Sequence, residues 1–61
     1  MRILYDILDG FGRQVYRTHD VEDAVETASD VSLMCENGIA YIITDFSVST
    51  FIEGELMEAV N

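Results

Sequence analysis

The side chains of this chain that could do chemistry are mainly carboxylates, and four of them share one short stretch. Glu22, Glu26 and Asp30 recur at intervals of four residues, with Asp23 beside them. On a helix, residues four apart rise by about 6 Å, a spacing of the same order as that of successive phosphates on a nucleic-acid strand. Such a row could enter a groove that is built to bind nucleic acid. The alternative is an ordinary solvated face, although such faces usually mix lysine with glutamate because like charges at this spacing repel.

Two apolar residues, Leu33 and Met34, follow this row in the sequence. At about 100° per residue, Leu33 projects on the same side as Glu22, and Met34 lies at the border of the acidic side. Either both are contact residues within an acidic interface, or the last helical turn tightens and both side chains join the core. The predicted partner-binding residues are Glu22, Asp23, Glu26, Asp30, Leu33, Met34 and Glu36.

The remaining residue types give catalysis and metal binding little support. His19 is the only histidine, and the run His-Asp-Val-Glu-Asp that it begins matches no metal-ligand pattern and no calcium loop. Cys35 falls on the apolar side of the predicted helix, where it would act as a small hydrophobic side chain. The serines have no neighbouring base. We therefore expect a protein that is not an enzyme and that binds neither a metal nor a cofactor.

Charge is distributed unevenly along the sequence. The three arginines are Arg2, Arg13 and Arg17, whereas ten of the twelve carboxylates come after Arg17, and the net charge is −9. A surface of this kind repels nucleic acid and anionic membranes and attracts basic protein surfaces. The expected partner is therefore the basic surface of a larger nucleic-acid-binding protein, without direct binding to nucleic acid or to a membrane.

Length and composition predict one folded domain over residues 1–61. Hydrophobic residues make up 49% of the chain, a content that disordered acidic tails lack. Cys35 is the only cysteine, which excludes an intrachain disulfide and favours a reducing compartment. No apolar run approaches the roughly 20 residues that span a bilayer, and the start at Met1 has no signal-peptide core. We expect a complete small gene product in the cytoplasm.

The first half of the chain predicts a hairpin followed by a helix. Residues Arg2–Leu8 and Arg13–Arg17 have strand-like composition, and Asp9-Gly10-Phe11-Gly12 between them is a hairpin signal. Asp20 is a suitable N-cap for a helix over Val21–Glu36, which would end at Asn37-Gly38. The apolar stripe expected to face the core consists of Val21, Ala24, Val25, Ala28, Val31, Ser32 and Cys35.

The second half predicts a third strand and an ambiguous tail. Residues Ile39–Phe46 are typical of a strand. Thr50-Phe51-Ile52-Glu53 matches a capping box and predicts a short C-terminal helix, which we prefer to a fourth strand over residues 47–52. The expected fold is α+β, with a three-stranded antiparallel sheet in the order 2-1-3 packed on one amphipathic helix. Both sheet faces are apolar, so the C-terminal segment or a second subunit must cover the second face.

Compact, acidic, cysteine-poor α+β proteins of this size resemble the accessory inhibitors that bacteriophages and mobile elements make against host or defence proteins, several of which imitate DNA. The resemblance lies in size, charge and architecture. It implies a non-catalytic, acidic protein-binding module that blocks a basic nucleic-acid-binding surface. The alternative function is that of a small structural or regulatory homodimer whose acidity serves solubility only.

Overall fold

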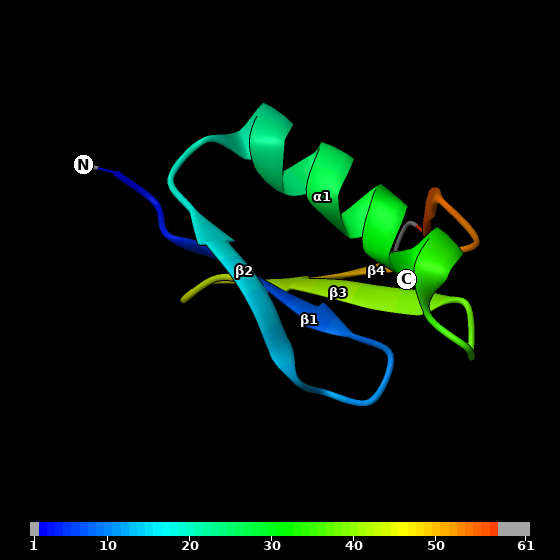
Figure 1. The fold of residues 1–61 in the computed structure, drawn as a ribbon. Helices are drawn as coiled ribbons and strands as arrows, with labels where there is room; N and C mark the ends of the chain where they lie inside the picture. Colours follow the sequence, from blue (N-terminus) through cyan, green and yellow to red (C-terminus); the bar gives the residue numbers. More distant parts are fainter. Residues whose placement is uncertain (1, 58–61) are drawn as a thin grey trace.

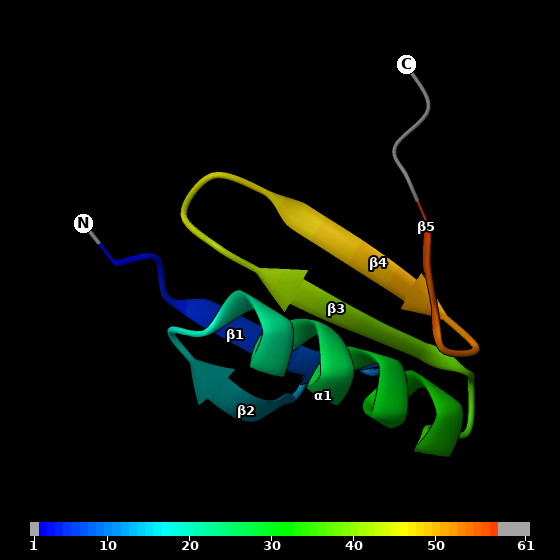
Figure 2. The same ribbon diagram turned by 90° about the horizontal axis from the view of Figure 1, so that it is seen from above.

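One α-helix packs across one face of a five-stranded antiparallel sheet (Figure 1). The computed structural model describes residues 2–57. In chain order the elements are β1 (Tyr5–Asp9), β2 (Gln14–Thr18), α1 (Val21–Met34), β3 (Ile39–Ile43), β4 (Val48–Ile52) and β5 (Glu55–Met57). The strand order is β2-β1-β3-β4-β5. Seen from above, α1 lies over the β2–β1–β3 side, and β4 and β5 extend the sheet beyond it (Figure 2).

The predicted hairpin is confirmed, with its strands shifted slightly along the chain to Tyr5–Asp9 and Gln14–Thr18. Asp9 organises the turn, because its Oδ1 accepts hydrogen bonds from the backbone N–H groups of Phe11 and Arg13, both at 2.9 Å. These bonds, that from Arg13 first, lower the pKa of Asp9. Gly12 has φ of +86°, a conformation that glycine adopts without steric cost.

The helix begins as predicted and ends two residues early, at Met34 rather than Glu36. Asp20 is the N-cap, and its Oδ1 accepts a hydrogen bond from the Glu22 N–H at 3.0 Å. Cys35 caps the other end with extended backbone, and its N–H donates to the Val31 carbonyl at 2.8 Å. The extended Cys35 stops the helix before the Asn-Gly pair that the sequence suggested as the end.

Only part of the predicted core stripe is buried. Ala24, Ala28 and Ser32 are completely buried, and these small side chains let α1 approach β1 and β3 closely. Val21 and Val25 are 52% and 42% exposed, contrary to the prediction. They border a groove on the β4 side of the helix instead of facing the centre of the sheet.

The C-terminal helix prediction is wrong, because the segment forms strands β4 and β5. Val48, Thr50 and Ile52 are β-branched and Phe51 is aromatic, a composition that favours a strand. β4 also pairs along its whole length with β3, whose edge would otherwise have unpaired backbone groups. The rival prediction of a fourth strand was correct, and residues 58–61 of the predicted helix lie outside the described residues.

The sheet therefore has five strands rather than three, and its order differs from the predicted 2-1-3. The predicted order corresponds only to the first three strands of the observed order, β2-β1-β3, and lacks β4 and β5. The third strand ends at Ile43 instead of Phe46. Thr44 stops it, because its N–H donates to the Ser47 carbonyl at 2.9 Å and its Oγ1 accepts from the Phe46 and Ser47 N–H groups. Phe46 is left 75% exposed in this turn.

The core lies between α1 and the face of the sheet that it covers. Ile7, Ala40, Ile42 and Phe51 are buried there, with Tyr5 and Val31 packed against them. Neighbours along each strand point the other way, onto a face that no described element covers (Figure 1). The part of the chain that the structure describes contains no helix long and apolar enough to cross a membrane.

Candidate protein-binding surface

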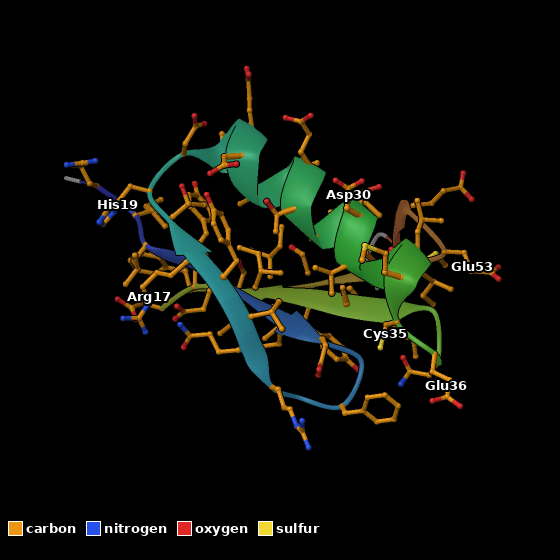
Figure 3. The ribbon with its side chains drawn as sticks, in the orientation of Figure 1. Arg17, His19, Asp30, Cys35, Glu36 and Glu53 are labelled. Carbon is orange, nitrogen blue, oxygen red and sulfur yellow. The ribbon has the colours of Figure 1, made fainter. Side chains whose placement is uncertain are left out.

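The structure places three of the predicted carboxylates on the outer surface of α1. Glu22, Glu26 and Asp30 are all exposed, one turn apart along the helix. We call these three residues the acidic row. Figure 3 shows Asp30 on α1 with its side chain outside the helix–sheet core. The capped, regular helix gives the row a fixed spacing of about 6 Å per step along the axis.

Asp23, which was predicted to belong to the same surface, has a different role. It is half-buried, and its Oδ2 accepts a hydrogen bond of 2.7 Å from the Tyr16 hydroxyl on β2. This bond and the negative charge of Asp23 raise the pKa of Tyr16. The pair ties the first turn of the helix to the sheet. Tyr16 carried no signal in the sequence, because the pairing depends on how α1 crosses β2.

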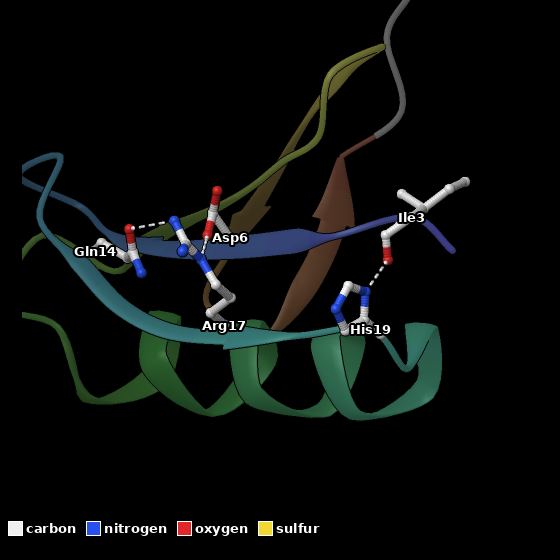
Figure 4. Close-up of polar contacts among 5 residues, drawn as sticks. All are labelled: Ile3, Asp6, Gln14, Arg17 and His19. Carbon is white, nitrogen blue, oxygen red and sulfur yellow. Dashed lines mark hydrogen bonds and ion pairs between the residues drawn. The ribbon is translucent and has the colours of Figure 1, made fainter. Parts of the chain in front are cut away.

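No cation compensates the acidic row within residues 2–57. The only ion pair there joins Arg17 Nε to Asp6 Oδ1 at 2.6 Å (Figure 4). Arg17 also reaches the side-chain oxygen of Gln14 at 3.4 Å. Both partners of the ion pair lie on the side of the sheet away from α1. The positive charge of Arg17 is therefore paired with Asp6 on the opposite side of the molecule and does not offset the charge of the acidic row.

Leu33 and Met34 lie on the surface and not in the core. Leu33 is 63% exposed and Met34 is 84% exposed, which excludes the alternative that the last turn folds both inward. Leu33 packs against the turn between β4 and β5, since a Cβ added at Gly54 would lie 3.2 Å from its Cγ. Met34 is the more accessible of the two for contact with another molecule.

The turn between β4 and β5 is fastened to the helix by two serines. Ser29 Oγ donates to the Gly54 carbonyl at 2.8 Å, and Ser32 Oγ accepts from the Gly54 N–H at 2.7 Å. The turn residues Glu53 and Gly54 have φ of 49° and 87°, as a two-residue type I′ hairpin requires. We call Ser29, Ser32 and Gly54 the serine clamp.

The serine clamp brings a further carboxylate, Glu53, next to the C-terminal half of α1 (Figure 3). Glu53 is exposed, so it extends the acidic surface from the helix onto the sheet. Our tail prediction missed this arrangement. The available signal was the Glu53-Gly54 pair between two apolar runs, which is the spacing of a tight hairpin.

Glu36 is exposed but lies beyond the helix, in the connection to β3, and does not continue the acidic row. Asn37 holds this connection, since its Nδ2 donates to the Gly10 carbonyl at 2.8 Å and its Oδ1 accepts from the Ile39 N–H at 3.2 Å. Cys35 is half-buried rather than part of the core, and its thiol donates to the same Oδ1 at 3.2 Å. The sequence indicated the loop but not these contacts.

The other chemistry-bearing residues are not gathered into a site. His19 is exposed, with its Nδ1 3.2 Å from the carbonyl oxygen of Ile3 (Figure 4). Within residues 2–57 no three histidine, cysteine or acidic side chains are grouped as metal ligands would be. The groove beside Val21 and Val25 has a volume of about 230 Å³, and its walls are apolar and hydroxyl-bearing side chains. Two members of the acidic row, Glu22 and Glu26, border a shallow hollow of about 370 Å³ together with Val21 and Val25. The surface that these residues build is therefore an open one that combines carboxylates with apolar side chains.

No protein-family model matches this chain, and no curated protein or solved structure is significantly similar to it. The structure provides a rigid helix with an uncompensated acidic row, with Glu53 and the exposed Met34 near its C-terminal end. Such a surface can bind a cationic surface by electrostatic attraction and apolar contact.

Proposed function

We propose that this protein is a non-catalytic acidic binding module that occupies and blocks a basic, nucleic-acid-binding surface on a larger protein. It would act in the manner of the DNA-mimicking inhibitors of phages and mobile elements, in the cytoplasm. The observation that supports the proposal most is the acidic row of Glu22, Glu26 and Asp30, exposed on one helix and without a cation beside it in residues 2–57.

The rigidity of this surface favours binding, because a preformed surface has little conformational entropy to lose when it meets a partner. Asp20 caps the helix, Asp23 ties its first turn to Tyr16, and the serine clamp fastens its C-terminal half to the sheet. The carboxylates are thus presented on a backbone that is held at both ends. A flexible acidic tail would lack this advantage.

The arrangement of charged and apolar groups also supports the proposal. Glu22 and Glu26 form an i, i+4 like-charge pair, and so do Glu26 and Asp30, and each costs stability by about 0.2–0.5 kcal/mol. Such a cost is offset when a basic partner supplies the missing cations. Long-range attraction would speed association, and Met34, 84% exposed, would add desolvated contact area.

Charge reversal on the acidic row tests the proposal. The partner is first captured from a lysate with the tagged protein and then purified. Glu26→Lys should slow association with it by about fivefold and make the rate less dependent on salt, because one steering charge is reversed. Asp45→Lys is the matched control, since Asp45 is equally an exposed carboxylate but lies in the loop between β3 and β4. It should have a much smaller effect, as measured by stopped-flow or surface-binding kinetics.

Competition with nucleic acid completes this test. If the module covers a nucleic-acid site, a labelled oligonucleotide and the protein should exclude each other from the purified partner. Simultaneous binding of both would contradict the proposal. So would equal association rates for Glu26→Lys and the parent, because the acidic row would then be only a solvated surface.

A further inference from the structure

The face of the sheet opposite α1 is left uncovered by the described elements (Figure 1). Residues paired across neighbouring strands share a face, so the register assigns its members. Three rows cross it, and they consist of Arg17, Asp6, Ile43 and Val48; of Gln14, Leu8, Tyr41, Thr50 and Met57; and of Ile39, Ile52 and Glu55. We call this set the open face.

The open face has the composition of a protein interface and not that of a solvated sheet. Seven of its members are apolar, and most of them occupy the central strands β1, β3 and β4. Most of its polar members lie toward the two edges, with the Asp6–Arg17 ion pair and Gln14 on one side and Glu55 on the other. An apolar centre with a polar rim is the usual anatomy of an interface. A sheet face exposed to water would instead carry mainly polar side chains.

The distribution of charge favours a second copy of this chain as the occupant. A protein of net charge −9 repels its own copies unless the surfaces that meet are free of net negative charge. The open face meets that condition closely, because Arg17 neutralises Asp6 and Glu55 is its only other carboxylate. The acidic row lies on the other side of the molecule, on the surface of α1 that faces away from the sheet. Two copies joined face to face would hold their acidic rows far apart.

The area of the open face is compatible with a small, reversible dimer. Five strands spaced by about 4.8 Å, each up to five residues long, give a flat footprint of about 24 Å by about 17 Å. Each copy would thus contribute about 400 Å² before the relief of the side chains is counted. Two copies would bury about 800 Å² by this measure, below the roughly 1,200–2,000 Å² of stable complexes, which is why the expected association is weak.

We infer that the open face is the interface of a homodimer formed by sheet-to-sheet packing around Leu8, Tyr41 and Thr50. The association is reversible and lies in the micromolar range or weaker. Its consequence is bivalency, because the two helices point away from each other and each displays an acidic row. The inference does not depend on the proposed function, since it uses the opposite side of the molecule.

Sedimentation equilibrium between about 5 μM and about 500 μM at near-physiological salt tests the inference. The parent protein should pass from monomer to dimer over this range. Thr50→Lys places a charge at the centre of the open face and should weaken the dimer by roughly tenfold or more. Val25→Lys is the control, because it adds the same charge to an apolar residue on α1, 42% exposed, and should leave the dimer unchanged. Far-UV circular dichroism checks that both variants are folded.

A measurement on the unmodified protein provides an independent test. Amide chemical shifts that change with concentration should cluster on β1, β3 and β4 and be absent from the outer side of α1. A parent that stays monomeric throughout would overturn the inference and leave the face to a different protein or to solvent. It would equally be overturned if Thr50→Lys, folded, dimerised as well as Val25→Lys, or if the shift changes clustered on the helix.

Discussion

At the scale of single residues, Ser32 shows how much one side chain can determine. Among the described residues, Ser32 is the one polar residue whose side chain is completely buried. Its hydroxyl both donates and accepts a hydrogen bond. It donates to the Ser29 carbonyl at 2.7 Å and accepts from the Gly54 N–H at 2.7 Å. A neutral side chain in the last turn of the helix thereby positions the turn that carries Glu53.

Ser32→Ala should therefore lower the free energy of unfolding by about 1–3 kcal/mol, because the Gly54 N–H loses its hydrogen bond to a completely buried side chain. Ser29→Ala is the matched control. Ser29 is only half-buried, whereas Ser32 is completely buried, so the loss of Ser29 should cost less. Urea denaturation of the two variants measures the difference. Equal effects would show that the Gly54 N–H finds another partner when Ser32 is removed.

Single residues also show where sequence reasoning succeeds and where it fails. Asp20 is recognisable as an N-cap because capping depends only on the next three residues. The exposure of Glu22 and Glu26 follows from helical periodicity. The bond between Asp23 and Tyr16 does not, because it depends on the angle at which α1 crosses β2. The acidic row could be predicted, but the different role of Asp23 within it could not.

At the scale of elements, the two hairpins differ in how visible they are from the sequence. The β1–β2 turn has two glycines and an aspartate that accepts its backbone N–H groups, so its signal is entirely local. The residues at the β4–β5 turn also match a capping box, so their local sequence is compatible with a helix as well as with a hairpin. Pairing with the free edge of β3 decides the outcome, since long-range packing overrides weak local preference. A prediction made from local pattern alone therefore misplaced the tail.

The glycines of these two turns provide a matched pair of substitutions. Gly12 and Gly54 have nearly the same backbone angle, φ of +86° and +87°, so alanine should strain both by about 1 kcal/mol. At Gly12 the added Cβ would meet nothing within 4 Å, whereas at Gly54 it would press on Leu33 at 3.2 Å. Gly54→Ala should therefore destabilise the protein more than Gly12→Ala in thermal or urea unfolding. The reverse order would mean that Leu33 moves away without loss.

At the scale of the whole molecule, the acidic row and the open face lie on opposite sides. The acidic row lies on the outer surface of the helix, and the core lies between the helix and the sheet. The open face carries the Asp6–Arg17 ion pair, whose charges cancel. The sequence predicts the amphipathic helix and the antiparallel sheet that make this arrangement possible. It does not predict the five strands, because pairing β4 and β5 onto β3 depends on contacts between residues distant in sequence. The size of the open face is a consequence of those two added strands.

The uncompensated charge of the whole molecule should make its stability depend on salt. The Debye length falls from about 30 Å at 0.01 M to about 10 Å at 0.1 M salt, so repulsion among the exposed carboxylates weakens over this range. For the acidic row alone, two like-charge pairs of about 0.2–0.5 kcal/mol each correspond to a rise in Tm of a few degrees in a domain of this size. Thermal unfolding must be followed at one protein concentration, because dimerisation would also raise Tm.

Two controls separate screening from other effects of salt on Tm. Sodium chloride and tetramethylammonium chloride should act alike if the cation only screens, whereas a bound cation would distinguish them. The combined variant Glu22→Gln, Glu26→Gln and Asp30→Asn keeps the size of the side chains, removes three charges and should show a smaller rise. A parent whose Tm is flat between the two salt concentrations would show that its carboxylates barely repel one another. Repulsion within the acidic row would then not destabilise the folded state. A basic partner would consequently gain no binding energy from relieving that repulsion.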